Sequence, residues 1–418
     1  MNSYPGDTPF DVAVIGRGPV GAAAVLGSVR AGLRTAWVGP AAPAGAGVVS
    51  ITDIADANDP ALARTWDSRV FALSPAARTL LGQLKVWDAL ELPRIAPVYD
   101  MRIYPGEGTE ARELHFDAYE ACIDALAWIV EGRNLSSTLS RAVSFSSATL
   151  IEGSLSDLNH ANERFAELRL DSGARLSARL VVGADGAQSA TRRLAGLPAI
   201  EHDYPQTAVV ANFETGEPHR DCAYQWFGGF GVLALLPLPG NRCSMVWSAP
   251  HALADQLIDM DPGALAARVG QASGGKLGTL TTITPAERFA LRRIEVPSLI
   301  ARRTVLVGDA GHVVHPLAGQ GMNLGFGDVG CLVDTLKARE PFRDLGDMLL
   351  LRRYERARKE AVTAMRLATD GLQRLFDPDS IAALGPMARP LTSARDLGWL
   401  AVASSGWLKR RLIRVAAT

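Results

Sequence analysis

The first forty residues alternate apolar runs and small-residue stretches in a regular order. Phe10–Ile15 is a compact apolar run of the kind that forms a buried strand. A glycine-rich turn follows at once, an alanine-rich stretch continues to about Arg30, and the β-rich run Thr35–Val38 comes next. A strand, a glycine turn, a helix and a second strand within about 30 residues predict the βαβ unit that opens a dinucleotide-binding fold.

The rest of the chain divides into three kinds of pattern. Residues 40–65 are rich in Ala, Gly, Pro and Asp, which predicts a long loop. Residues 205–250 alternate as antiparallel strands do, whereas the segments before and after them are typical of parallel α/β units. We therefore expect an α/β fold with an antiparallel insertion. The predicted strands are Met101–Tyr104, Glu113–Phe116, Leu176–Val182, Val232–Leu238, Cys243–Trp247 and Thr304–Val307, a hairpin is expected within 149–175, and the predicted helices are Leu135–Val143, 319–337, 346–376 and 391–415.

Length and composition limit the classes of protein. At roughly 150 residues per domain, the 418 residues suggest two or three domains, or one large fold with an inserted lobe. The net charge of −1 argues against a nucleic-acid partner. No apolar run is long enough to span a membrane, the N-terminus lacks a signal-peptide pattern, and the four cysteines lack the spacing of a zinc site or a disulfide framework. These features predict a soluble, cytoplasmic protein.

The glycine turn has the spacing Gly16-x-Gly18-x-x-Gly21. The first glycine permits the tight turn, the second lets a pyrophosphate approach the backbone, and the third lets the helix pack closely against the strand. The N-terminus of the helix then favours the phosphate charge. The turn predicts dinucleotide binding, but it does not decide between FAD and NAD.

One residue that this unit usually carries is missing. An acid about 20 residues after the glycine turn normally binds the hydroxyls of the adenosine ribose. Here the second strand ends Trp37-Val38-Gly39-Pro40, with Gly39 in the place of the acid. Either the ribose is bound differently or the affinity is reduced. On the second interpretation, Gly39→Glu should raise FAD affinity, because it restores an acceptor.

Two later apolar strands each end in an acid. The first leads into Asp185-Gly186, and the second delivers Asp309, whose carboxylate can accept hydrogen bonds from a polyol chain. The turn Pro316-Leu317-Ala318-Gly319-Gln320-Gly321 then exposes backbone N–H groups at the start of a helix. Such a helix start stabilises negative charge, as on the N1–C2=O edge of a reduced flavin. The alternative for Asp309 is that it only caps a turn.

Together, these three motifs resemble those of the group A FAD-dependent aromatic hydroxylases, which have the para-hydroxybenzoate hydroxylase fold. Within that group the chain resembles the ubiquinone-biosynthesis hydroxylases, and the likeness covers nearly its whole length. The further stretches that carry it are 66–74, 81–87, 128–131, 233–238, 353–358 and 368–376.

The resemblance implies roles for particular residues. Arg69 would contact the ribityl or pyrophosphate portion of FAD, Asp309 would bind the ribityl hydroxyls, and Asp185 with Gly186 would order the pyrophosphate region. The turn from Pro316 to Asn323 would surround the isoalloxazine ring. The complete implied set is Gly16, Gly18, Gly21, Arg69, Asp185, Gly186, Asp309, Pro316, Gly319, Gly321, Met322 and Asn323. No metal ligand is implied, and the sequence does not identify a residue that deprotonates a phenol.

The resemblance also implies the organisation of the chain. A Rossmann-like FAD-binding domain would comprise residues 1–90, 126–200 and 290–340, and an inserted, mainly antiparallel substrate domain would comprise residues 91–125 and 201–289. Residues 341–418 would form a C-terminal helical region. Two departures concern local contacts: Gly132 stands where the family often has Asn, and Gly327 where it often has Arg.

The implied activity is hydroxylation of a polyprenylated phenol in ubiquinone biosynthesis, with NAD(P)H and O2 as co-substrates and a flavin C4a-hydroperoxide as the hydroxylating species. The protein would bind the reactants and exclude water, because the cofactor carries the chemistry. Two alternatives stay open. One is a related hydroxylase of a small soluble aromatic, and the other is a flavin-weak scaffold subunit of a quinone-biosynthesis complex. Other ubiquinone-biosynthesis proteins are candidate partners, and a homodimer is one option for the oligomeric state.

The last segment of the chain is basic. Residues 341–418 carry 14 Lys and Arg against 8 Asp and Glu. On a helical wheel, Leu408 and Leu412 fall on one side and Arg410 and Arg414 on the other. The apolar side can pack on the body of the chain. The basic side would then dock the enzyme at the periphery of the inner membrane, close to a lipid substrate.

Two residue pairs allow two interpretations each. His312 and His315 could bind a metal, but histidines that pack or form hydrogen bonds are the simpler interpretation on a loop without a carboxylate cluster. Trp226 and Phe227 could form a wall of the substrate pocket or belong to the core of a sheet.

Overall fold

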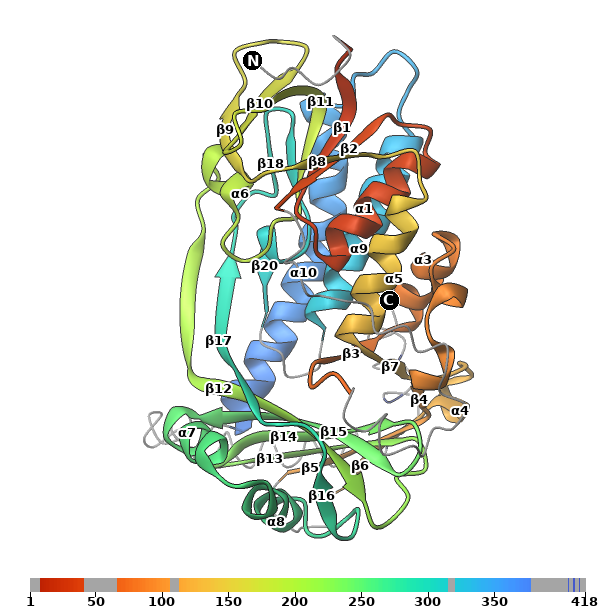
Figure 1. The fold of residues 1–418 in the computed structure, drawn as a ribbon, viewed down its shortest axis with the longest axis vertical. Coiled ribbons are helices and arrows are strands. Elements are labelled where there is room, and N and C mark those ends of the chain that lie inside the picture. Colours follow the sequence, from red (N-terminus) through yellow and green to blue (C-terminus); the bar gives the residue numbers. More distant parts are fainter. Residues whose placement is uncertain are drawn as a thin grey trace.

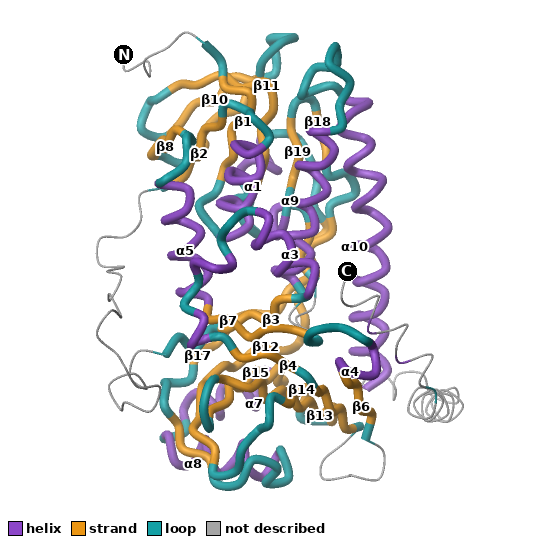
Figure 2. The backbone as a smooth tube through the Cα atoms, turned by 90° about the vertical axis from the view of Figure 1, so that its right-hand side faces the viewer, coloured by secondary structure: helices purple, strands orange, loops and turns teal. Residues whose placement is uncertain are grey.

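The computed structural model describes residues 8–40, 66–105, 113–314 and 320–376, together with Ser405, Lys409 and Ile413. Two sheets lie at opposite ends of the molecule, and the long strands β12 and β17 run between them (Figure 1). Helices α1, α5, α9 and α10 lie along the upper sheet and the space below it, as the second view also shows (Figure 2). The arrangement places the face of the lower sheet opposite the strand ends of the upper one.

The upper sheet is mostly parallel and has the strand order β18-β19-β11-β1-β2-β8, with β10 paired to β11 and β9 paired to β10. In β1, Val14 lies opposite Trp37 of β2 and Val182 of β11. Strands covered on both faces are apolar throughout, which explains the continuous apolar runs of the sequence. The strands are β1 (Phe10–Ile15), β2 (Thr35–Gly39), β8 (Thr149–Glu152), β9 (Leu155–Asn159), β10 (Ala166–Leu170), β11 (Arg175–Gly183), β18 (Ile300–Ala301) and β19 (Thr304–Leu306).

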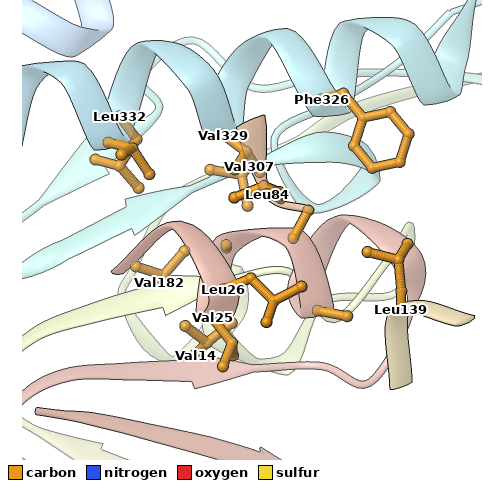
Figure 3. Close-up of a cluster of buried hydrophobic side chains, with 14 of the residues drawn as sticks. Val14, Val25, Leu26, Leu84, Leu139, Val182, Val307, Phe326, Val329 and Leu332 are labelled. Carbon is orange, nitrogen blue, oxygen red and sulfur yellow. The ribbon is translucent and has the colours of Figure 1, made fainter. Parts of the chain in front are cut away.

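Helices cover this sheet and share one core with it (Figure 3). Val14 and Val182 of the sheet belong to the same cluster as Leu26 of α1 and Phe326 of α9. Helices α1 and α9 approach closely at Gly27, where an added Cβ would lie 2.5 Å from Val333 Cγ2. The helices are α1 (Pro19–Arg30), α3 (Pro75–Gln83), α5 (Gly132–Ser144), α6 (Ala190–Leu194), α9 (Gly321–Lys337) and α10 (Met348–Phe376).

The lower sheet has the order β20-β17-β12-β15-β14-β13-β5-β6, with β16 beside β12. Its pairs are antiparallel except β5 with β13. Helices α7 (His251–Asp259) and α8 (Pro262–Ala272) pack on one face, where Trp226 stacks on Tyr104 at 5.4 Å. Trp226 therefore belongs to the core of the sheet. The strands are β5 (Asp100–Tyr104), β6 (Leu114–Asp117), β12 (Ile200–Thr215), β13 (Cys222–Gly228), β14 (Gly231–Leu238), β15 (Arg242–Pro250), β16 (Leu280–Thr282), β17 (Glu287–Glu295) and β20 (His312–Val313).

A three-stranded sheet with the order β3-β7-β4 lies beside the lower sheet. Its strands are β3 (Val70–Leu73), β4 (Ala96–Val98) and β7 (Ala127–Glu131), and the short helix α4 (Ala118–Ala121) lies nearby. Glu131 and Arg94 form a buried two-point ion pair, with oxygen–nitrogen distances of 2.6 and 2.7 Å. Glu131 also accepts a hydrogen bond from the backbone N–H of Asp67 at 2.7 Å, so this pair fixes the loop that enters β3.

The predicted elements in the described residues are confirmed, with ends shifted by a few residues. The predicted helix 391–415 lies outside the described residues, apart from three isolated positions. Several elements were not predicted: helices α3, α4, α7 and α8 and strands β3, β4, β7, β16, β17, β18 and β20. Among the described helices, none is both long and apolar enough to cross a membrane.

Candidate functional site

One cavity of about 780 Å³ connects the two large sheets. The upper side of its wall comes from the turn that starts α1, the strand ends at Ala184 and Val307, and the start of α9 at Gly321 and Met322. The loop before β3 and the start of that strand, Asp67–Phe71, form one flank. The lower side is the face of the sheet that α7 and α8 leave free, contributing Met101, Ala208, Val210, Gln225, Ala234, Leu236, Val246, Glu287, Phe289 and Leu291.

The three glycines of the first turn have three different surroundings. Gly16 has a φ of +117°, and an added Cβ would lie 2.2 Å from the carbonyl oxygen of Ala184. A Cβ on Gly21 would lie 2.2 Å from the carbonyl oxygen of Gly16. Gly18 has nothing within 4 Å of the equivalent position and borders the cavity. The first and third glycines thus allow close packing, and the second leaves the backbone open to a ligand at the helix N-terminus.

Asp309 borders the same cavity from the turn that follows β19. The side chain is exposed on the cavity side, but protein atoms surround the rest of it. Burial raises the pKa of Asp309, and the charges of His312 and Arg69 act in the opposite direction. A carboxylate at this place can accept hydrogen bonds from hydroxyl groups of a ligand.

Behind Asp309, the fully buried Asp328 of α9 fixes the turn. One carboxylate oxygen accepts hydrogen bonds from Gly308 N at 2.8 Å and from His312 Nε2 at 2.6 Å, and the other accepts one from Arg358 Nε at 2.6 Å. Burial alone would raise the pKa of Asp328, but His312 and Arg358 outweigh burial and lower it. His312 is therefore a hydrogen-bonding histidine, as the simpler interpretation held, while His315 lies outside the described residues.

The departure at Gly327 has a structural reason. An added Cβ at this position would lie 3.0 Å from Arg358 Nη2. The missing side chain therefore makes room for the guanidinium group that pairs with Asp328. No group of three or more His, Cys, Asp or Glu side chains suited to a metal ion exists in the described part of the chain.

Arg69 lies on the flank of the cavity. Its guanidinium group is 5.2 Å from the ring centroid of Phe71 and 5.6 Å from that of Phe289. The backbone N–H of Arg69 donates to Asp67 Oδ1 at 3.1 Å. A Cβ on Gly132 would lie 3.3 Å from Asp67 Oδ2, so glycine at this position allows α5 to start against this loop. The two aromatic rings hold the guanidinium group at the cavity rim.

Two predicted residues have side chains turned to the protein itself. Asp185 accepts hydrogen bonds from the backbone N–H of Thr191 at 2.9 Å and from its hydroxyl group at 3.0 Å, which fixes the start of α6. The Asn323 amide donates to Ala72 O at 2.9 Å and accepts from Ser74 N at 2.9 Å, which fastens α9 to the end of β3. Both residues therefore shape the cavity wall without lining it.

Of the predicted set, the structure brings six residues to one cavity: Gly18, Arg69, Gly186, Asp309, Gly321 and Met322. Gly16 and Gly21 serve packing. Pro316 and Gly319 lie outside the described residues. Gln225 and Phe289 line the cavity but were not predicted from the sequence. The alternation along β13 and β17 could have placed them on one face of the sheet, but it could not show that this face borders the cavity.

These residues fit a flavin dinucleotide. An open glycine at a helix N-terminus suits a diphosphate, a carboxylate suits a polyol, and an apolar wall suits an aromatic ring system. The face of the lower sheet gives the same cavity a largely apolar wall opposite these strand ends.

Residues 135–369 match the model of a protein family described as FAD binding domain. The chain is 34% identical over 414 residues to the ubiquinone hydroxylase UbiL of Rhodospirillum rubrum, covering 98% of this chain and 90% of that protein. It is 32% identical over 411 residues to the 3-demethoxyubiquinol 3-hydroxylase of Escherichia coli, covering 98% of both. The crystal structure of Klebsiella pneumoniae HpxO complexed with FAD and uric acid has the same fold, with a TM-score of 0.69, 17% identity, and coverage of 97% of this chain and 95% of that one.

Proposed function

The chain belongs to the family of FAD-dependent monooxygenases that includes the ubiquinone-biosynthesis hydroxylases, and from this we propose that it hydroxylates the aromatic ring of a polyprenylated phenol in ubiquinone biosynthesis. One observation carries the choice of substrate class. A single cavity joins the open glycine turn to a largely apolar face of the lower sheet. Such a face suits an aromatic ring that carries an isoprenoid chain better than it suits a small polar aromatic.

The residues of the chain would hold the cofactor along the upper wall. Gly18 and the N-terminus of α1 would bind the diphosphate, Asp309 the ribityl hydroxyls, and Gly321 and Met322 the flavin ring, with Arg69 at the rim. Bound FAD supplies electron uptake from NAD(P)H and the activation of O2. The described residues hold one glycine turn of this type, so NAD(P)H would approach the flavin through the same cavity.

The lower wall would bind and orient the substrate. Its apolar side chains, with Ala234 and Leu236 at the centre of β14, would pack on the ring and exclude water, which otherwise favours loss of the activated oxygen as peroxide. Gln225 is the amide side chain among them. It would form a hydrogen bond with a ring oxygen and so fix the ring carbon that faces the flavin.

We propose the same domain boundaries that were inferred from the sequence. Residues 1–90, 126–200 and 290–340 would form the FAD-binding domain, residues 91–125 and 201–289 the substrate domain, and residues 341–418 a C-terminal region. Strand β17, which starts at Glu287 and reaches the upper half of the molecule, would then link the two domains.

The test of the proposed function is an analysis of lipids in a strain that lacks the protein. We expect a polyprenylated quinone precursor that lacks one ring hydroxyl group, and its disappearance when the wild-type chain is returned. Purified protein should contain FAD and oxidise NAD(P)H. A normal ubiquinone profile, together with turnover of a small aromatic, would instead favour a hydroxylase of a small soluble aromatic. A protein without flavin that still restores ubiquinone would favour a scaffold subunit of a quinone-biosynthesis complex.

Ala234→Phe should block the substrate compartment. Ala234 lines the lower wall, and a phenyl ring at this position would project into the cavity. Overpacking costs roughly 1–3 kcal/mol, so kcat/KM for a prenylated phenol should fall on the order of 10- to 100-fold. Flavin content should stay unchanged, because the upper wall is untouched. Ala161→Phe on an exposed loop is the matched control, and equal kcat/KM in the two variants would show that this wall does not bind substrate.

We also propose that the basic C-terminal segment docks the enzyme on an anionic membrane surface. The segment lies outside the described residues apart from Ser405, Lys409 and Ile413, and Ile413 is buried. A polyprenyl chain is nearly insoluble in water, so a substrate of this kind must be collected from a bilayer or a lipid-carrying partner. Electrostatic attraction near an anionic membrane amounts to about 1 kcal/mol for each basic residue.

Replacing the four basic residues near the C-terminus with Gln should therefore weaken binding to anionic liposomes. The loss of binding should be larger at low salt than at high salt, and flavin content should be unchanged. Sedimentation with liposomes measures this binding. Absence of liposome binding in the wild type, or equal binding in the variant, would contradict the docking role. The four residues are Lys409, Arg410, Arg411 and Arg414, and a control with the same loss of charge replaces the exposed residues Arg164, Arg169, Arg175 and Arg193.

A further inference from the structure

The place of the missing ribose acid is covered by an arginine side chain. Gly39 is the last residue of β2. An added Cβ on Gly39 would lie 2.7 Å from Arg17 Cγ and 3.3 Å from Arg17 Cδ. Arg17 belongs to the glycine turn itself, between Gly16 and Gly18. The space that a carboxylate side chain would need at the end of β2 is therefore filled by a cationic one.

The guanidinium group of Arg17 extends along the ends of neighbouring parallel strands. It lies 5.6 Å from the ring centroid of Trp37 in β2, and its Nη2 donates to the carbonyl oxygen of Ile151 in β8 over 3.4 Å, a long hydrogen bond. The Nε atom is buried and has no hydrogen-bond partner in the described part of the chain. Within the described residues the guanidinium group thus forms one long hydrogen bond, and its remaining terminal donors can serve a ligand that brings an acceptor.

The location of Arg17 indicates which part of FAD it would contact. Strands β1, β2 and β8 are parallel neighbours, and their carboxyl ends lie on one edge of the sheet. In folds of this type the diphosphate lies at the helix N-terminus after β1, and the adenosine lies at the end of β2. Arg17 reaches from the first of these places to the second.

We propose that Arg17 binds the adenosine diphosphate half of FAD. Its guanidinium group donates hydrogen bonds to oxygen atoms of the ribose or the adjoining phosphate, where other proteins use a carboxylate as acceptor. The protein is thus the hydrogen-bond donor in this contact instead of the acceptor, and Gly39 makes room for the Arg17 side chain. The proposal rests on FAD binding and names the residue that replaces the missing acid.

This assignment reverses the expectation for Gly39→Glu. A glutamate at this position would displace Arg17 and form an ion pair with it, so FAD affinity should not rise. The competing explanation is that Arg17 only links β2 to β8 through Trp37 and Ile151. In that case its loss would lower the melting temperature without changing the affinity for nucleotides.

The first experiment titrates the apoprotein with FAD, and separately with ADP and with FMN as the two halves of the cofactor. Arg17→Met keeps an apolar chain over Trp37 and removes the donors. We expect this variant to bind FAD and ADP roughly 10- to 100-fold more weakly, and FMN within about twofold of the wild type. Equal ADP affinity, with or without a change in melting temperature, would overturn the proposal.

The second experiment is a cycle of variants at the two positions. Gly39→Glu alone should leave FAD affinity unchanged or lower it. Added to Arg17→Ala, which frees the space, Gly39→Glu should strengthen FAD binding by about tenfold relative to Arg17→Ala alone. Tighter binding by Gly39→Glu alone would overturn the proposal. A wild-type apoprotein that binds no FAD would contradict the cofactor assignment itself, which is a different result from either outcome.

Discussion

Asp309→Ala should give a folded protein that is purified almost without FAD. The carboxylate borders the cavity and forms no hydrogen bond with the described residues, so its removal disturbs the core little. Hydrogen bonds to a charged group contribute about 1.5–3 kcal/mol each, so the loss of two to the ribityl hydroxyls should weaken FAD binding by about 100-fold or more. The ratio of flavin to protein absorbance and a titration of the apoprotein measure this effect.

Two control variants test whether the charge and the position of Asp309 matter. Asp309→Asn keeps the size of the side chain and should retain part of the affinity, and Asp203→Ala removes an exposed acid of β12 and should change nothing. Because burial raises the pKa of Asp309, FAD affinity should fall with decreasing pH earlier than an ordinary aspartate with a pKa near 3.9 would allow. Stoichiometric flavin and full turnover in Asp309→Ala would show that another residue binds the ribityl chain.

Asp328→Ala should cause the largest loss of stability among single changes near the site. The carboxylate is fully buried and compensates Arg358, and it also accepts hydrogen bonds from His312 and Gly308. Removing one partner of a buried ion pair typically costs about 3–5 kcal/mol, because the other charge stays buried without compensation. Urea unfolding of the apoproteins measures the difference in the free energy of unfolding.

The pH dependence has a definite sign. The pKa of Asp328 is lowered in the folded protein, so its contribution to stability is present above the pKa of the unfolded chain and is lost as the pH falls. The difference between wild type and Asp328→Ala should therefore shrink in acid. Asp334→Ala changes an exposed acid on the same helix and should leave stability nearly unchanged. A difference below about 1 kcal/mol for Asp328→Ala would contradict the role of the buried network.

The two predictions concern residues that act in succession: Asp328 positions the turn, and Asp309 on that turn would contact the cofactor. Asp328 binds Gly308 N and so fixes the turn from which Asp309 enters the cavity. Asp328→Ala should therefore also weaken FAD binding, but it should do so together with the loss of stability. Asp309→Ala should weaken FAD binding alone. Comparing the two variants at equal temperature distinguishes a ligand contact from the support of that contact.

The sequence by itself determined the parts that depend on neighbouring residues. The opening βαβ unit, the tight turn at Gly16, the open helix start at Gly18 and the position of Asp309 just after a strand end all follow from local geometry, and the structure has them where the pattern placed them. Local rules were sufficient because a tight turn, a helix N-terminus and a strand end are each formed within a few residues.

Only the tertiary structure decided which residues share the cavity and which support it. Alternation along β13 separates Gln225 from Trp226, but the packing of α7 and α8 on one face decides that Trp226 is in the core and Gln225 in the cavity. The pairing of Asp328 with Arg358 joins two helices, and the cover of Gly39 by Arg17 joins a turn to the next strand. Such contacts connect residues whose separation in sequence carries no period, so only the folded chain brings them together.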